Sequence, residues 1–392
     1  MRSMSRTARY RYRIEPNAEQ RLMLARQFGC VRWTYNWALA TKSEAFRERA
    51  EKVSYAETDR RLTQIKREPE TEWLQEVSSV PLQQALRHLD KAYTAFFKGT
   101  ARFPRFKAKG HRQSATYTTR GFSLKDSGTK GQPLVQLAKT SAPLKIRWSR
   151  PLPSGPSSLT VIQEPDGRYY ISFVVQVDPT PLPRTKASVG IDLGLTDVVV
   201  TSDGWRSGNP KHLAKSQARL ALEQRRLAKK TKGSANRAKQ RRKVAKLHAK
   251  VRNQRADFLH QMSTRLVRRY DVICAESLNV KGMVKNHSLA RAISDAGWST
   301  LVNQLAYKAE WYGKTFVQID RWYPSTKTCS GCGHTMESLP LDVRRWTCPG
   351  CQAEHDRDEN AAKVIKGVGH TLLASGESGS PQLALVSGGG SR

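Results

Sequence analysis

The sequence predicts a multidomain α/β protein, and three observations support this fold class. The chain has 392 residues, enough for two or three domains that each bury a core. Strand-like alternation and long helical stripes of apolar residues both recur along it. Residues 178–186 contain three prolines in nine positions, which is typical of a linker between two such regions.

The charge points to a polyanionic partner. The formal net charge is +35, from 68 Lys and Arg against 33 Asp and Glu, and such an excess repels itself unless a polyanion neutralises it. Nucleic acid is the usual polyanion. A membrane surface is the weaker alternative, because no apolar run approaches about 18 residues. The basic first residues lack the apolar segment of a signal peptide, so we expect a cytoplasmic protein.

The N-terminal region begins with a predicted strand and a predicted helix. Residues 9–16 alternate polar with aromatic or apolar side chains, and Pro16 ends the pattern. Asn17 followed by Gln20 is a capping-box sequence that predicts a helix start. The apolar residues that then recur at helical spacing are Leu24, Phe28, Val31, Tyr35 and Leu39.

Residues 80–99 predict a second strong helix, which Gly99 ends. Its apolar stripe consists of Leu82, Leu86, Leu89, Tyr93 and Phe96. Its polar stripe consists of Gln84, Arg87, His88 and Lys91. That stripe fits a solvated face and a nucleic-acid-binding face equally well.

Residues 102–120 mix cations with aromatic rings, and two interpretations are open. Phe103, Phe106 and Tyr117 stand among Arg and Lys residues, which suits phosphate contact combined with base stacking. An ordinary basic loop explains the composition equally well. From 121 to 178 the pattern is strand-like, and 158–177 predicts a β-hairpin with residues 165–167 in its turn.

Residues 211–255 hold seventeen Lys or Arg and one acid, Glu223. Two segments of high helical propensity are separated by residues 231–234, which predicts a helical hairpin with one packed edge. A nucleic-acid-binding role is favoured over a solvated spur, because so many cations without counter-charges would repel one another. The tail is rich in Gly and Ser and is expected to be disordered from 368 to 392.

Three distant segments place carboxylates next to predicted strands or a predicted helix. Asp192 follows an apolar run that predicts a buried strand, Glu276 ends a second such strand, and Asp356 and Asp358 precede a short helix. Clustered oxygen ligands suit Mg²⁺, and buried carboxylates repel one another unless a cation offsets their charge. Singly, each acid has an ordinary explanation: a turn cap, an Arg partner, a helix N-cap. The ordered set predicts a divalent-metal site.

Four cysteines form a second motif. Cys329, Cys332, Cys348 and Cys351 have the spacing C-x2-C-x15-C-x2-C, which predicts a tetrahedral site for one structural Zn²⁺. A redox pair is the alternative, and two matched CxxC turns argue against it. His334 and His355 lie nearby and are expected not to be ligands.

These motifs together resemble the TnpB family of transposon-encoded RNA-guided nucleases, relatives of the type V CRISPR effectors. The matching segments are GIDLGL (190–195), AESLNVKGM (275–283), YPSTKTCSGCG (323–333), CPGC (348–351), DRDENAA (356–362), GCVRWTYNWAL (29–39) and FPRFKAKG (103–110). The resemblance spans nearly the whole chain. Ser277 departs from the acid that family members often carry after the glutamate, which is not one of the core ligands.

The resemblance implies an RNase H-like RuvC nuclease domain with an inserted zinc ribbon, and an N-terminal wedge β-barrel interrupted by a helical recognition domain. The implied ranges are 1–15 for the first wedge strand, 16–115 for the recognition domain, 116–180 for the wedge barrel, 181–328 and 353–367 for RuvC, and 329–352 for the zinc ribbon. The catalytic acids carry over to Asp192, Glu276 and Asp358, with Asp356 as the alternative third ligand. They would hold two Mg²⁺ ions for DNA cleavage.

The implied partners are a guide RNA encoded near the transposon end and a double-stranded DNA target, held in a monomeric ribonucleoprotein that associates with the nucleoid when bound to DNA. Base pairing with the guide would select the target, and the protein would read only a short adjacent motif. The expected nucleic-acid contacts are Gln83, Gln84, Arg87, Lys91, Arg105, Lys107, Ser114, Thr116, Tyr117, Arg241, Arg242 and Lys243. Three alternatives are open: a cleavage-inactive RNA-guided repressor, a miniature type V CRISPR effector, and an RNA-binding zinc-ribbon protein.

Overall fold

The structure, a computed structural model, describes residues 5–340 and 342–376. It contains two compact units. Unit 1 comprises the described residues up to Asp178 together with Arg241–Lys246, and unit 2 comprises the remaining described residues. Within the described part of the chain, no helix combines the length and the apolar character needed to cross a membrane.

The helices of unit 1 begin where the sequence predicts. Helix α1 (Ala18–Arg49) starts with the expected capping box, in which the Asn17 side chain accepts from the Gln20 N–H and the Gln20 side chain accepts from the Asn17 N–H. Helix α3 (Ser79–Phe97) buries the first part of its apolar stripe, Leu82, Leu86 and Leu89. The other helical elements of this unit are α2 (Tyr55–Ile65) and the 3₁₀ segments η1 (Pro69–Gln75) and η2 (Thr119–Gly121).

The main sheet of unit 1 has five antiparallel strands in the order β2-β6-β7-β1-β5. They are β2 (Gln113–Thr118), β6 (Ser158–Gln163), β7 (Tyr169–Val177), β1 (Arg6–Ile14) and β5 (Ile146–Arg147). The predicted β-hairpin is confirmed as β6 and β7. Strand β2 crosses the expected domain boundary between residues 115 and 116.

The expected closed barrel is wrong for the described residues. Strands β2 and β5 are the two edges of the sheet and do not pair with each other. Strands β3 (Phe122–Lys125) and β4 (Leu134–Leu137) pair only with each other, as a separate hairpin. Since β5 spans only Ile146–Arg147, it offers too few backbone groups to close the sheet.

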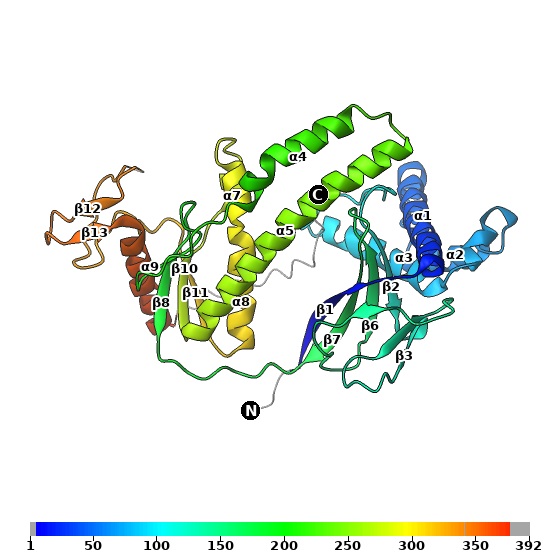
Figure 1. The fold of residues 1–392 in the computed structure, drawn as a ribbon, viewed down its shortest axis with the longest axis horizontal. Helices are drawn as coiled ribbons and strands as arrows, with labels where there is room; N and C mark the ends of the chain where they lie inside the picture. Colours follow the sequence, from blue (N-terminus) through cyan, green and yellow to red (C-terminus); the bar gives the residue numbers. More distant parts are fainter. Residues whose placement is uncertain (1–4, 341, 377–392) are drawn as a thin grey trace. The chain divides into compact units, whose positions relative to one another are not determined.

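Unit 2 is built on a four-stranded sheet in the order β11-β10-β8-β9. Strands β8 (Ser188–Asp192), β10 (Val272–Glu276) and β11 (Thr315–Ile319) run parallel, and β9 (Val200–Thr201) is antiparallel to β8. Figure 1 shows α9 on one side of this sheet and α5 and α8 on the other. Because both faces are covered, the inner positions of the parallel strands are mainly apolar, as residues 272–275 of β10 illustrate.

The two faces of this sheet bury different cores. Val189, Ile191, Ile273 and Ala275 pack with apolar residues of α5 (Ala235–Arg269), α7 (Ala290–Ala296) and α8 (Trp298–Trp311). On the opposite face, Cys274, Val317 and Ile319 pack with Ile365 of α9 (Arg357–Ala374). Helix α6 (Val280–Met283) follows β10.

The predicted helical hairpin is confirmed as α4 (His212–Ala228) and α5, and α5 continues to Arg269, beyond the expected end at 255. The extension follows from Leu259, Met262 and Leu266, which cover the sheet. Helix α9 likewise continues to Ala374, so residues 368–374 are not part of a disordered tail. Val368 and Leu372 pack on the core around Cys274, which explains the longer helix. Residues 377–392 of the expected tail lie outside the described residues.

Candidate active site and zinc site

Asp192 and Glu276 are neighbours at one end of the unit 2 sheet. Each is the last residue of a parallel strand, and the register pairs Ile191 with Ala275 immediately before them. Successive side chains of a strand point to opposite faces. Since Ile191 and Ala275 belong to the core beneath α5 and α8, Asp192 and Glu276 point to the face covered by α9. Both carboxylates are half-buried.

Asp358 reaches this face because α9 lies directly on the two strands. A Cβ atom at Gly190 of β8 would stand 1.9 Å from the Ala362 carbonyl oxygen, and one at Gly369 of α9 would stand 2.3 Å from the Cys274 sulfur. Only glycine permits so close an approach. The helix therefore crosses the strands at fixed points, with Asp358 in its first turn.

The electrostatics link Asp192 to Asp358 and Glu276 to Asp192. Burial raises the pKa of Asp192 to about 7, with a further contribution from the negative charge of Asp358. Burial also raises the pKa of Glu276 to about 7, and the charges of Asp192 and Asp320 add to the effect. Arg357 and Arg344 oppose the shift at Asp192. The site is thus short of positive charge.

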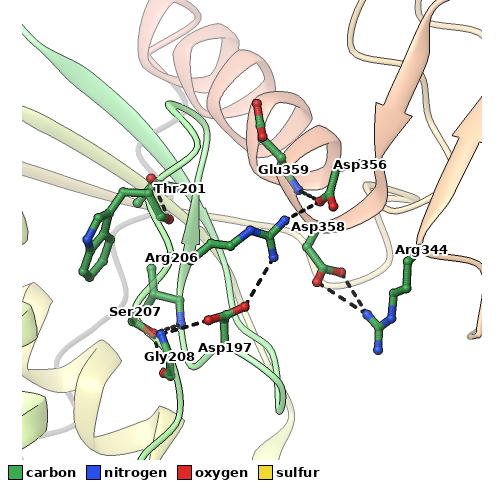
Figure 2. A network of polar contacts seen from close by, with 11 residues as sticks. Asp197, Thr201, Arg206, Ser207, Gly208, Arg344, Asp356, Asp358 and Glu359 are labelled. Atoms are coloured by element: carbon green, nitrogen blue, oxygen red, sulfur yellow. Dashed lines mark hydrogen bonds and ion pairs between the residues drawn. The ribbon is translucent and has the colours of Figure 1, made fainter.

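Asp356 and Asp358 have different roles at the start of α9. Asp356 is the N-cap, where its carboxylate accepts from the Glu359 N–H at 3.1 Å and forms an ion pair with Arg206 at 2.7 Å. Arg206 also contacts Asp197 at 3.3 Å, as Figure 2 shows. Asp358 instead forms an ion pair with Arg344 at 3.3 Å. The carboxylate coupled to Asp192 is that of Asp358, and Asp356 is occupied as a cap.

Sequence reasoning missed three residues of this site. Asp320 directly follows β11, so it stands at the same end of the parallel sheet as Glu276, and its position after a strand was a usable signal. Arg206 is 150 positions from Asp356, and Arg344 is 14 positions from Asp358, beyond the reach of any helix or turn pattern. No local pattern marks such long-range ion pairs.

The four cysteines converge as their spacing predicts. Their sulfur atoms all lie within 4.8 Å of one another, with 3.7 Å between Cys329 and Cys351 and 3.6 Å between Cys332 and Cys348. Zn–S bonds of about 2.3 Å in a tetrahedron place sulfurs about 3.8 Å apart, so the thiols fit one Zn²⁺. In the described part of the chain, no other set of His, Cys, Asp and Glu side chains is gathered this closely.

The environment of Cys329 favours the thiolate that zinc binds. Burial alone would raise the pKa of this thiol, but hydrogen bonds from the backbone N–H groups of Cys332 and Gly331 and from His355 lower it to about 6. The His355 Nε2 atom lies 3.1 Å from the Cys329 sulfur. His355 therefore contacts one member of the four-thiol set.

The cysteine region is tied to α9. Strands β12 (Arg345–Thr347) and β13 (Glu354–Asp356) pair on either side of the second CxxC turn, and β13 leads directly into the helix. Buried Asn360 of α9 donates to the Thr328 carbonyl at 2.7 Å and accepts from the Ser330 N–H at 2.9 Å, on either side of Cys329. The helix that carries Asp358 is thus held by the segment that carries the zinc thiols.

The expected nucleic-acid contacts lie in unit 1 and divide into exposed and buried residues. Gln83, Arg87, Lys91, Arg105, Lys107, Arg241, Arg242 and Lys243 are exposed, and Gln84, Ser114 and Thr116 are half-buried. Arg87 donates to the Tyr55 hydroxyl at 3.2 Å. Tyr117 is fully buried, so it is a core residue of β2 and the expected contact with nucleic acid is wrong there. The alternation along β2 places Ser114 and Thr116 on the face opposite Tyr117.

Three family models match the chain. Residues 172–287 match OrfB_IS605, described as "Probable transposase", and residues 298–365 match the Cas12f1-like TNB domain. Residues 4–51 match a model described as a helix-turn-helix domain, HTH_OrfB_IS605. In the described residues of that last range the structure has strand β1 and the single long helix α1, not two helices joined by a turn.

Known proteins resemble the chain over nearly its full length. A Streptomyces pristinaespiralis protein named "Putative RNA-guided DNA endonuclease" is 48% identical, over 95% of this chain and 92% of its own length. The Escherichia coli (strain K12) protein of the same description, InsQ, is 32% identical, over 95% of both chains. The structure of a Cas12f1–sgRNA–target DNA complex matches with a TM-score of 0.60 at 12% identity, over 92% of this chain and 99% of that chain, which shows a common fold.

The fold and the sequence relationships thus define the class of Cas12f-like and IS605 OrfB proteins. Within that class, the chain belongs to the TnpB family, whose curated members include the two relatives just described.

Proposed function

We propose that the protein is an RNA-guided DNA endonuclease that cuts target DNA beside a short adjacent motif with a RuvC-type active site. The observation that carries this proposal is the placement of Asp192 and Glu276 on one face and at one end of the unit 2 sheet, under the helix whose first turn carries Asp358. The parallel strands with a carboxylate at the end of β8 and β10 support an RNase H-like assignment. The names of the relatives support guidance by RNA and a DNA substrate.

The three carboxylates suit two Mg²⁺ ions. Their oxygen atoms are hard donors, and their raised pKa values report a deficit of positive charge that divalent cations would remove. Bound Mg²⁺ would lower the pKa of a water molecule and stabilise the leaving oxygen of the DNA strand. Asp358 is paired with Arg344 in the structure, so Arg344 must release that carboxylate, wholly or in part, when the metal binds.

The protein's own residues position the site. Strands β8 and β10 fix Asp192 and Glu276, and the contact at Gly190 fixes the start of α9 with Asp358. Arg206 holds the cap of α9 by bridging Asp197 and Asp356. Zinc, bound by the four cysteines, would keep the segment around Cys329 folded and thereby hold Asn360 and the helix.

The rest of the chain would bind RNA and the guide–target duplex. We propose that residues 1–15 and 116–180 act as a wedge domain, 16–115 as a recognition domain, 181–328 and 353–367 as RuvC, and 329–352 as the zinc ribbon. The exposed cations of the helical hairpin would contact phosphates. The exposed residues Gln83 and Arg87 of α3, with the half-buried Gln84 of α3 and Ser114 and Thr116 of β2, would read the adjacent motif through base edges.

The test compares cleavage with binding on one preparation. Asp192→Ala should abolish Mg²⁺-dependent cleavage of a guide-matched duplex and leave RNA-guided binding of that duplex nearly intact, because base pairing and the cationic surface hold the target. Glu276→Ala and Asp358→Ala should behave alike, and a double variant should be no worse than either single one. Cleavage that survives in Asp192→Ala would refute the active site. Loss of binding together with cleavage would instead show a structural role for Asp192.

A further inference from the structure

Residues 102–120 contain three aromatic rings among cations, Phe103, Phe106 and Tyr117. The three rings differ in their exposure. Tyr117 is fully buried. Phe103 is 48% exposed and packs edge-on against Phe96 and Tyr93, with ring centroids 5.4 and 5.6 Å apart. Phe106 is 64% exposed and makes no ring contact with another aromatic side chain of the described residues. It is the one ring of the three whose face is available to a ligand.

The backbone around Phe106 is held in place. The Asn36 side chain of α1 donates to the Lys107 carbonyl at 2.9 Å and accepts from the Lys107 N–H at 2.8 Å. The Gln113 amide donates to the carbonyls of Ala108, Lys109 and His111 at 2.9–3.3 Å. Nearby Pro104 is buried. A rigid backbone reduces the entropy that a binding partner must overcome, so the ring is preorganised for contact.

Phe106 borders a recess with cationic walls. The recess measures ≈ 270 Å³ and lies between α1 and residues 106–114, with Phe28, Val31, Arg32, His111 and Arg112 in its lining. The Lys107 ammonium lies 3.8 Å from the centroid of the Tyr35 ring, which keeps this charge beside the recess. Arg105, Lys107 and Lys109 are all exposed. A flat apolar ring beside cations fits a nucleobase and its flanking phosphates, and it does not fit an apolar protein groove, which would have to bury those charges.

We propose that Phe106 stacks on an unpaired or terminal nucleobase, which enters the recess while Arg105 and Lys107 contact the adjacent phosphates. This inference rests on the proposed function for the presence of nucleic acid, and it assigns one side chain to one contact. The nucleobase can come from the guide RNA or from target DNA, since both present the same aromatic face.

The test uses oligonucleotide binding and needs no cleavage. The probes are a short oligouridylate and a short oligothymidylate, each with one central 2-aminopurine whose fluorescence falls on stacking. For the probe that the wild type binds, Phe106→Leu should weaken binding about 5- to 150-fold, the equivalent of about 1–3 kcal/mol. It should also restore the fluorescence of that probe. Phe106→Tyr should behave as the wild type. The probe that responds identifies RNA or DNA as the source.

A matched control and the salt dependence make the outcome specific. Phe97→Leu removes a ring that is 77% exposed but stacks on Tyr93 with centroids 6.2 Å apart, and it should leave binding unchanged. Phe106→Leu should not change the slope of log affinity against log salt, whereas Lys107→Ala should reduce it, because only the second change removes a phosphate contact.

Three results would overturn the proposal. The Phe106→Leu variant could bind both probes as tightly as the wild type, or Phe97→Leu could lose as much affinity as Phe106→Leu. The third result is a wild-type protein that forms a dimer which Phe106→Leu dissociates, since the ring would then contact protein. Unaltered thermal unfolding of Phe106→Leu excludes misfolding as the cause of any loss. Failure of the proposed nuclease would appear separately, as cleavage surviving in Asp192→Ala.

Discussion

The environment of Asp192 disfavours the ionised form of its carboxylate. The half-buried carboxylate lies near Asp358, and its pKa is raised to about 7. In the unfolded chain the same group ionises at about pH 3.9. Between these two values the folded state keeps a proton that the unfolded state loses, so rising pH destabilises the metal-free protein, and the loss is complete above about pH 7.

Replacing Asp192 with Asn should remove this loss of stability with rising pH. Asp192→Asn carries no titrating group, so the metal-free variant should be more stable than the wild type by about 1–3 kcal/mol near pH 8. This is less than the ~4 kcal/mol of the full pKa shift, because the carboxylate is only half-buried. The difference in stability between the variant and the wild type should vanish below about pH 4, where Asp192 is protonated in both the folded and the unfolded wild type. Denaturant titrations in chelator at the two pH values measure the difference.

Magnesium provides the control for this prediction. Mg²⁺ should stabilise the wild type and leave Asp192→Asn nearly unaffected, because ligand binding to the folded state alone raises stability. A variant that is less stable than the wild type at both pH values would show that the carboxylate, not the metal site, holds the strand.

The contact between β8 and α9 decides where the third carboxylate stands. At Gly190 a methyl group would meet the Ala362 carbonyl oxygen at 1.9 Å, and neither backbone can move without displacing its element. Gly190→Ala should therefore destabilise the protein by about 1–3 kcal/mol. It should also lower cleavage by about a hundredfold, since a 1 Å displacement of a catalytic group has that effect.

Gly367→Ala is the matched control on the same helix. An added Cβ there meets nothing within 4 Å, so the variant should cleave normally and gain up to about 1 kcal/mol from helix propensity. Equal losses in the two variants, measured by thermal unfolding and cleavage rate, would show that α9 tolerates no change anywhere rather than at its contact with β8.

Zinc removal tests the link between the thiol set and α9. Cys329→Ser or Cys351→Ser should reduce bound zinc from about one ion per chain to about none. Cleavage should fall at least about tenfold, because Asn360 loses its fixed partners on either side of Cys329. Cys30→Ser, at a buried thiol of α1, should keep its zinc and its activity. Metal analysis and cleavage assays measure the two quantities. Normal cleavage by a zinc-free variant would contradict the proposal that the zinc-binding segment positions α9.

Local patterns in the sequence predicted the elements better than their assembly. The capping box at Asn17 and the hairpin of β6 and β7 depend on neighbouring residues, and both are confirmed. Tyr117 looked available in a basic segment, but the period-2 alternation of β2 buries it. The barrel was wrong because closure depends on edge strands far apart in the chain. Arg206 could not be predicted for the same reason, since only the folded chain brings it to Asp356, whereas the position of Asp320 directly after a strand was a signal that could have been used.

At the scale of the whole molecule, the net charge of +35 requires a partner that neutralises it. Neutralising Arg241, Arg242 and Lys243 together should weaken binding of a guide RNA. It should also reduce the slope of log affinity against log salt by about 2, for three lost single-strand phosphate contacts. Filter binding across a salt series measures both quantities.

The control for this prediction lowers the net charge equally elsewhere. Neutralising Lys125, Lys130 and Lys139, all exposed in the region of β3 and β4, should change affinity far less. An identical loss of affinity in the two triple variants would mean that RNA affinity depends only on the total charge of the protein and that the hairpin is not a specific RNA-binding surface.

The placement of α9 on β8 also has a consequence for synthesis of the chain. Asp192 and Asp358 are 358 − 192 = 166 positions apart, and the proposed active site needs both. At about 5–20 residues per second, a ribosome needs on the order of 10–30 s to travel between them. For most of that interval the nascent chain already carries the hairpin cations proposed to contact RNA but lacks Asp358. A growing chain can therefore acquire its guide before it is able to cut, and a chain truncated within that interval would bind without cutting.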